Sequence, residues 1–330
     1  MARRSGGHAH CCRSSSGGWR SSPHARLALV AACAAGSVPA RATEGGGNSY
    51  PIGVDNLYSG LMLPEGANWL LFYQHYDAGS SKDNTGHDNP KLASFHLRLD
   101  ALAPRLSYVW PGVRVFGANL ETRVVVPIVS ANLDMSVARP APLPPLDKGG
   151  NKTGLADMTL APVILGWHSG SFHQMAGVEF HLKTGAYDVH DPVNIGRNYY
   201  QIAPSYAFTW FPTRNVDISA KFRYGFNTRN EATHYQSGDE ATIEFSAGYH
   251  VTPRLTLGLN GYYYVQTTDD TQNGARVNGH GNRGRVTALG PDICFQLTDK
   301  VSFSLKGQFE FGARNRPEGN RIWAMARISL

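Results

Sequence analysis

The last ten residues, RIWAMARISL, show a strict two-residue period that continues to the end of the chain. Every second residue from Ile322 to Leu330 is apolar, whereas the alternate set from Arg321 to Ser329 is mixed and carries two arginines. A chain end frays in water unless another element holds it. A closed β-barrel supplies such an element, because its last strand pairs with its first and leaves no open edge.

The same alternation of apolar and polar residues recurs along most of the chain. In VDISAKFRYGF, Ile218 and Phe222 share an apolar face and Asp217 and Lys221 share a polar one. Runs of this kind span 9–13 residues, longer than usual in globular proteins and long enough to cross a bilayer when tilted. We expect about twelve strands, near residues 68–76, 94–109, 114–128, 155–167, 172–184, 199–211, 215–227, 239–251, 255–267, 284–297, 301–312 and 321–330.

The predicted connections alternate between long and short. Six longer polar stretches are separated by the short turns WPGV, HSGS, PTR, TPR and TDK. Long outer loops and tight periplasmic turns are typical of an outer-membrane barrel. The sequence therefore predicts an all-β, antiparallel transmembrane β-barrel of about twelve strands; the alternative is a soluble β-sandwich whose apolar faces pack on each other. The pattern changes phase around residues 101–102, which indicates either a bulge or a wrong assignment of the two faces there. Trp323 is expected at a membrane interface.

The positive charge of the chain belongs to its first 42 residues. The chain has 31 Lys and Arg against 25 Asp and Glu, and residues 1–42 hold six arginines and no acid, so the remainder carries 25 of each sign. A neutral body gives no electrostatic reason to bind nucleic acid. The Arg-rich start, the apolar run LALVAACAAGSV and the small residues Ala40 and Ala42 predict a cleaved signal peptide over residues 1–42. Lipid modification at Cys33 is the alternative; after cleavage only Cys294 remains, so no intrachain disulfide is expected.

Several segments between Asn48 and Leu330 resemble the outer-membrane family named for the meta-pathway of phenol degradation. They are NSYPIGVDN with LPEGANWLLFYQHY, then GLADMTLAPVILGWH, LKTGAYD, NYYQIAPSYAFTWFP, QSGDEATIEFSAGYH and NRGRVTALGPDICFQL. The resemblance implies a transporter-like barrel in the bacterial cell outer membrane that passes hydrophobic aromatic compounds. Its partners would be outer-membrane lipid, the barrel-assembly machinery and a small hydrophobic or aromatic solute. One departure is Leu330, where such barrels usually end in an aromatic residue.

The polar faces of the predicted strands carry charges of both signs. Cross-strand ion pairs that line or fill a narrow lumen are the expected result. The lumen is then either a polar channel with a constriction or a closed interior joined by salt bridges. The predicted lumen charges are Glu121, Arg123, Asp157, Glu179, His181, Lys183, Asp217, Lys221, Arg223, Glu244, Lys306 and Glu310.

Two further features predict what the lumen contains. Residues 43–67 precede the barrel, residues 68–330, and are too apolar for a free tail. We expect this periplasmic pre-barrel segment to pack either against the periplasmic mouth or inside the barrel as a plug. Aromatic side chains on the lumen face are candidates for stacking on a solute or, alternatively, for packing the lumen. These candidates are Tyr262, Tyr264, Tyr199 and Trp167. The Pro-rich residues 138–147 predict either a stiff lid over the mouth or an exposed spacer.

No catalytic residue, cofactor or metal site is predicted. Glu179 and His181 face inward together, but a metal site needs a third ligand, and a hydrogen-bonded lumen histidine explains the pair. A barrel phospholipase would need catalytic polar residues on the lipid-facing wall, which the pattern leaves apolar apart from threonines, and no G-x-S-x-G is present. The expected function is passive uptake of a small hydrophobic or aromatic compound. The alternative is a structural or adhesion barrel that acts through its outer loops.

Overall fold

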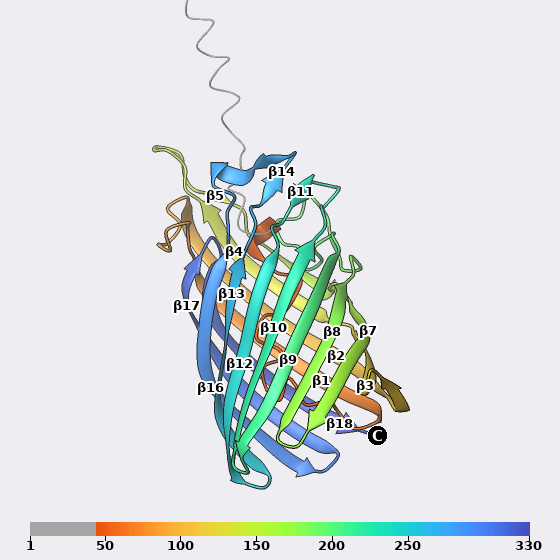
Figure 1. The fold of residues 1–330 in the computed structure, drawn as a ribbon. Coiled ribbons are helices and arrows are strands. Elements are labelled where there is room, and N and C mark those ends of the chain that lie inside the picture. Colours follow the sequence, from red (N-terminus) through yellow and green to blue (C-terminus); the bar gives the residue numbers. More distant parts are fainter. Residues whose placement is uncertain (1–43) are drawn as a thin grey trace, which may run out of the picture. The chain divides into compact units, whose positions relative to one another are not determined.

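Residues 44–330, the part of the chain that the computed structural model describes, form a closed antiparallel barrel (Figure 1). β3 and β4 continue one another across residues 126–127, and β6 and β7 across residues 156–158, so the wall has twelve strands, as predicted. None of the helices within residues 44–330 has the length and apolarity needed to cross a membrane. The wall strands are β1 (Gly66–Ser81), β2 (Leu92–Val115), β3 (Ala118–Val125), β4 (Ile128–Val137), β6 (Gly150–Leu155), β7 (Thr159–Ser169), β8 (Phe172–His181), β9 (Gln201–Thr213), β10 (Val216–Asn227), β12 (Glu240–Thr252), β13 (Leu255–Gln266), β16 (Arg285–Thr298), β17 (Val301–Arg314) and β18 (Pro317–Ser329).

The barrel closes between its first and last strands. β18 pairs with β1 from Asn68↔Ser329 to Asp77↔Asn320 without a register shift. The N–H of Leu330 donates to the carbonyl of Ala67 at 3.0 Å. The backbone is thus hydrogen-bonded to its last residue, as the two-residue period of the terminal sequence predicts.

Side chains alternate between the lumen and the outer face along the wall. In β10, Asp217, Lys221 and Arg223 are buried in the lumen, whereas Phe222 and Phe226 are exposed on the outside. Similar exposed leucine, isoleucine, phenylalanine and tyrosine side chains continue around β12, β13, β16 and β17. An apolar outer belt around a polar lumen is the arrangement that a bilayer requires of a barrel.

The polarity of the outer face changes toward the long-loop end of β1, β2, β4 and β6. Beyond one level, the outer face of these strands becomes polar and the inner face of β2 and β4 becomes apolar, whereas the inner face of β6 carries Lys152, which pairs with Asp191. The last apolar row on the outer face consists of Tyr73, Leu102, Ile128 and Leu155, and the next row consists of His75, Asp100, Ser130 and Thr153. Because these rows are set by cross-strand pairing, the inversion occurs at one height across adjacent strands.

Of the two explanations for the phase change at residues 101–102, the bulge is wrong and the assignment of the two faces is at fault. β2 pairs with β1 from Gly66↔Val109 to Ala78↔Leu97 without a register shift, and odd-numbered residues of β2 from Phe95 to Val109 face inward. The backbone therefore keeps its alternation while the environment of its two faces changes. When faces are assigned from polarity alone, this change of environment looks like a change in which residues face inward.

The first short turn lies later than the sequence predicts. Residues 110–113, WPGV, belong to β2 and fall in an irregular stretch between the pairs Val109↔Glu121 and Arg114↔Asn119. The chain reverses at Phe116 and Gly117, whose φ angles of 51° and 77° permit a two-residue hairpin turn. The proline and glycine in WPGV mark the irregular stretch of the strand instead.

Short elements lie at the long-loop end of the barrel (Figure 1). β11 (Tyr235–Gln236), β14 (Thr271–Gln272) and β15 (Ala275–Arg276) form a separate small sheet, followed by the 3₁₀ turn η3 (Val277–Gly279). β5 (Leu146–Asp147) pairs with the end of β4. The Pro-rich stretch leads into β5, and its Leu143 and Leu146 are exposed, which favours the spacer over the lid.

Candidate functional site

Residues 44–65, which precede β1, run inside the barrel and are called the inserted segment below. It begins with the 3₁₀ turn η2 (Glu44–Gly46) and continues without a strand. The N–H groups of Gly53 and Asp55 donate to the Glu244 carboxylate at 2.5 and 2.9 Å. Lys306 Nζ donates to the carbonyl of Gly53 at 2.6 Å. Wall side chains thus provide the hydrogen bonds that this buried backbone lacks within itself.

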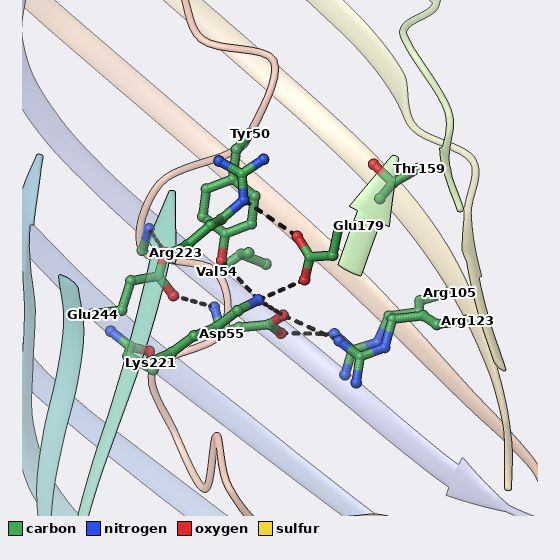
Figure 2. A network of polar contacts seen from close by, with 12 residues as sticks. Tyr50, Val54, Asp55, Arg105, Arg123, Thr159, Glu179, Lys221, Arg223 and Glu244 are labelled. Atoms are coloured by element: carbon green, nitrogen blue, oxygen red, sulfur yellow. Dashed lines mark hydrogen bonds and ion pairs between the residues drawn. The ribbon is translucent and has the colours of Figure 1, made fainter. Parts of the chain in front are cut away.

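Asp55 is the charged centre of the inserted segment (Figure 2). Its Oδ1 accepts a hydrogen bond from Arg105 Nη1 at 2.7 Å. Its Oδ2 accepts from Lys221 Nζ at 3.0 Å and from Arg123 Nη1 at 3.4 Å. These four residues are called the Asp55 cluster; its cations stand on β2, β3 and β10. One carboxylate on the inserted segment therefore joins three strands of the wall.

Asp55 is ionised at neutral pH. Burial raises the pKa of its carboxyl, but the charges of Arg105, Lys221 and Arg123 outweigh burial and hold this pKa well below its usual range. Within residues 44–330, Asp55 is the only carboxylate that forms an ion pair with Arg105. Removing one member of a buried ion pair leaves an uncompensated charge, which typically costs about 3–5 kcal/mol.

Two glutamates extend the Asp55 cluster along the wall. Glu179 Oε1 accepts from Lys221 Nζ at 2.8 Å, and its Oε2 accepts from Arg223 Nε at 3.3 Å. Glu121 Oε1 accepts from Arg123 Nε at 2.9 Å. Before Asp55 is counted, the ion-paired wall residues comprise four cations, Arg105, Arg123, Lys221 and Arg223, and two carboxylates, Glu121 and Glu179. Glu244 and Lys306, which bind the backbone of the inserted segment beside them, add one charge of each sign, so a surplus of two positive charges remains.

His181 joins this network as a hydrogen-bond acceptor. Its Nε2 lies 2.7 Å from Arg223 Nη2, and its Nδ1 lies 3.0 Å from Thr159 Oγ1. A guanidinium can only donate, so Nε2 is unprotonated in this contact. Within residues 44–330, no group of three or more His, Cys, Asp or Glu side chains is placed to hold a metal ion. The Glu179 and His181 pair thus serves the ion-pair network.

Two cavities meet at the Asp55 cluster. The loop-side cavity has a volume of about 430 Å³ and the turn-side cavity about 340 Å³. Val54, Asp55, Phe72, Arg105 and Arg123 line both of them. The partition between the two cavities is therefore built from the inserted segment and the wall residues that hold it.

The loop-side cavity has an apolar wall where the barrel faces are inverted. The side chains come from β2, from β4 and from the long connection after β8. They include Leu97, Leu99, Val129, Ala131, Leu133, Val193 and Ile195. A general porin has a polar lumen filled with water. The apolar wall distinguishes this cavity from such a lumen.

The tyrosines predicted to stack on a solute are covered by the inserted segment. Tyr262 and Tyr264 are 0% and 1% exposed and pack with Tyr50 and Ile52. The Tyr262 hydroxyl donates to Glu310 Oε1 at 2.6 Å, and Glu310 also pairs with Arg321 at 3.1 Å. Like the buried Tyr199, these tyrosines line neither of the two cavities. In this conformation they pack the lumen, which is the role that the sequence predicts as the alternative to stacking on a solute.

Trp167 and Lys183, two predicted lumen residues, lie outside the lumen. β7 has a register shift after Ala161, so its inward-facing residues change from odd-numbered to even-numbered positions. Trp167 therefore faces out, where its indole N–H donates to the Phe116 carbonyl at 3.1 Å. β8 ends at His181, so Lys183 is exposed, with Nζ 5.1 Å from the Tyr200 ring centroid.

Trp323, which the sequence predicts outside the lumen, lies inside it. It is 3% exposed and points into the lumen, where its indole N–H donates to Gln308 Oε1 at 2.9 Å. Its expected place at a membrane interface is therefore wrong, because it shares the inward face of β18 with Arg321.

Asp157 and Asp217 are buried but lie apart from the Asp55 cluster. Asp157 sits between β6 and β7 and accepts from the N–H groups of Gly185 and Arg197 at 2.8 and 2.7 Å. It thereby fixes the connection after β8 against the wall. Asp217 Oδ2 lies 2.9 Å from His250 Nε2. Both carboxylates hold local structure in this conformation.

The outer face is less uniformly apolar than the sequence predicts. Beyond the inversion, His75 Nδ1 lies 2.8 Å from Asp100 Oδ1, and His96 Nε2 lies 3.0 Å from Asp77 Oδ2. His–Asp pairs occur in hydrolase triads. In the described part of the chain, however, the structure gives neither histidine a hydrogen bond to a serine, threonine or cysteine. No triad is assembled by these pairs.

Gly60 lets the inserted segment approach the wall. Its N–H donates to Thr209 Oγ1 at 3.0 Å, and a Cβ at this position would lie 2.3 Å from the backbone carbonyl carbon of Phe208. We expect Gly60→Val to push the segment off β9 and raise the conductance of the protein in planar bilayers. Overpacking of this kind costs about 1–3 kcal/mol, which shifts a two-state population by roughly 5- to 150-fold.

Gly79→Val is the matched control for this substitution. A Cβ at Gly79 would meet no atom within 4 Å, so the same change there leaves the inserted segment undisturbed. Equal conductance of the two variants would contradict the role assigned to the contact at Gly60.

Comparison with known proteins adds a family and a fold. A family model described as putative MetA-pathway of phenol degradation matches residues 78–326. No curated protein gives a significant match to the sequence. The COG4313 outer membrane channel from Pseudomonas putida F1 is similar in structure, with a TM-score of 0.67 and 17% identity over 81% of this chain and 96% of that chain.

Two other outer-membrane proteins show a weaker likeness. The NanC porin has a TM-score of 0.42 and 12% identity over 79% of this chain and 100% of that chain. A FadL homologue from Pseudomonas aeruginosa has a TM-score of 0.38 and 11% identity over 86% of this chain and 95% of that chain. The likeness to the Pseudomonas putida channel supports the barrel fold, and the weaker two add nothing to it.

Proposed function

The chain belongs to the family described as putative MetA-pathway of phenol degradation, and from this we propose that it is an outer-membrane channel for passive uptake of small hydrophobic or aromatic compounds. The observation that carries the proposal is the apolar wall of the loop-side cavity. Residues such as Leu99 and Val129 there face inward on strands whose outer face is polar. A channel for hydrophilic solutes has no use for such a wall.

The place of this cavity along the barrel also favours uptake. It lies at the long-loop end, which in outer-membrane barrels faces the outside of the cell. A solute that enters from outside meets apolar side chains first and the Asp55 cluster second. The inserted segment then separates it from the turn-side cavity, so passage requires the segment to move. Such gating by a segment inside the lumen would keep the pore closed to unselected solutes.

A structural or adhesion barrel is the competing function. Such a barrel would act through its outer loops and would need only a solid interior. The two cavities and the apolar wall of one of them favour transport over that alternative.

Solute flux through the purified protein in liposomes tests the proposal. We expect a phenolic compound to cross faster than a sugar of similar size, because only the phenolic ring gains from contact with the apolar wall. The flux of a small ion measures how permeable the closed pore is to unselected solutes. Equal flux of all three probes would show an unselective pore, and no flux through a correctly folded barrel would favour the structural function.

A further inference from the structure

We propose that the three cations of the Asp55 cluster form a carboxylate-binding site in the pore. Asp55 occupies this site while the pore is closed, and an aromatic carboxylate takes its place during passage. This inference rests on the proposed function, since it assigns a substrate class to the same pore.

The Asp55 cluster has the geometry of a built carboxylate site. Each oxygen of the carboxylate has a close cationic donor, Arg105 at 2.7 Å on one side and Lys221 at 3.0 Å on the other. The cations stand on wall strands, whereas their present occupant belongs to a segment without strand structure. The wall therefore supplies the fixed part of the site, and Asp55 is the exchangeable part. Charge-assisted hydrogen bonds of this kind are among the strongest that a protein offers a ligand.

The charge balance of the wall selects an anion. Without Asp55, the wall part of the network has four cations against two carboxylates. A neutral solute that displaced Asp55 would leave Arg105 buried without a counter-ion. A monocarboxylate restores the pairing that Asp55 provides, so the exchange avoids the cost of an uncompensated buried charge.

The surfaces around the cluster indicate what the rest of the solute is. The Arg105 guanidinium lies over the Phe72 ring, 4.9 Å from its centroid, and both residues line the loop-side cavity. Ala101 and Ala103 continue this wall toward the apolar side chains of β2. A carboxylate bound at the cluster thus places its body against apolar atoms. An aromatic body gains from this contact, whereas hydroxyl groups of a sugar acid would lose hydrogen bonds to water.

The tether on Asp55 sets the concentration at which a solute competes. An intramolecular ligand acts at an effective concentration in about the millimolar range for a short flexible link. A free carboxylate must approach that concentration to displace Asp55. Neutralising Asp55 is therefore expected to lower the concentration of solute required by roughly tenfold or more.

Planar-bilayer recordings of the mature protein test the exchange, with benzoate, benzyl alcohol and inorganic phosphate as probes. We expect benzoate to raise the open probability, and the uncharged benzyl alcohol and the hydrophilic phosphate to leave it unchanged. In Asp55→Asn, the basal open probability rises and half-maximal opening by benzoate needs roughly tenfold less of it. Arg229→Gln, which breaks an exposed ion pair with Glu231 in an outer loop, should match the wild type.

Arg105→Gln is the complementary variant, and it is expected to abolish the response to benzoate. Since this substitution alters a buried pair, heat-dependent migration on SDS gels first checks that the barrel folds. If it does not fold, Asp55→Asn carries the test alone. The inference is overturned if benzyl alcohol or phosphate opens the pore as benzoate does, or if Asp55→Asn leaves the benzoate dependence unchanged.

The outcome separates this inference from the function on which it rests. If neutral phenolic solutes cross liposomes selectively but benzoate has no special effect, the carboxylate assignment fails and the channel function stands. If no aromatic solute crosses at all, both fail.

Discussion

Removal of residues 43–65 is expected to convert a nearly closed barrel into a conducting one. This change deletes the partition between the two cavities, together with Asp55 and the backbone groups that Glu244 and Lys306 bind. Conductance in planar bilayers should rise more than in any point variant. The wall also becomes less stable, because Arg105 loses its ion-pair partner at a cost of about 3–5 kcal/mol.

A covalent lock gives the opposite test of the same contact. Asn56 Nδ2 donates to Asn260 Oδ1 at 2.9 Å, so the two side chains touch inside the lumen. In a Cys294→Ser background, Asn56→Cys combined with Asn260→Cys should be joined by a short, reducible bifunctional thiosulfonate, which spans more than a direct disulfide and holds the inserted segment in place. The cross-linked protein should stay closed to benzoate and to phenolic solutes, and reduction should restore their flux. Unchanged flux in both the shortened and the cross-linked protein would show that the segment does not gate the pore.

Filling the loop-side cavity is expected to give the second large effect, a loss of phenolic flux. Ala131 is 4% exposed and points into this cavity from β4. Ala131→Phe removes space that the solute needs, and each loss of about 1.4 kcal/mol in binding lowers occupancy about tenfold. We therefore expect phenolic flux into liposomes to fall by roughly tenfold or more, with the barrel still folded.

Asn132→Phe is the matched control for the cavity-filling change. It adds the same side chain at the next position of β4, which is exposed on the outer face. Phenolic flux through this variant should equal that of the wild type. If Ala131→Phe also leaves flux unchanged, the solute does not pass through the loop-side cavity, and the observation that carries the proposed function loses its force.

The two-residue period predicts the barrel well because a bilayer imposes it on every wall strand. The apolar positions of RIWAMARISL correctly predict a closing strand, and β18 indeed pairs with β1 to its end. The pattern fails where the environment differs from a bilayer. At residues 101–102 it indicates a change of phase, although only the polarity of the two faces changes.

The candidate site was only partly predictable for a different reason. Glu121, Arg123, Glu179, Lys221 and Arg223 fall on the polar face of well-defined strands, so their place in the lumen follows from alternation. Asp55 lies in a segment without period, and no local pattern connects it with cations 50 or more residues away. Arg105 is odd-numbered like Leu97 and Leu99 and faces inward with them. Because the sequence pattern indicates a change of phase at residues 101–102, it misses this placement of Arg105.

The row at which the two faces of β2 and β4 invert also decides how a solute distributes between phases. Beyond Leu102 and Ile128, the wall shields an apolar space from the surrounding water. A dissolved aromatic molecule therefore has two places to partition, the lipid and this cavity of about 430 Å³. Longer alkyl substituents strengthen its partition into the cavity and slow its release from it. Across a series of alkyl phenols, throughput should thus rise with hydrophobicity, pass through a maximum and fall.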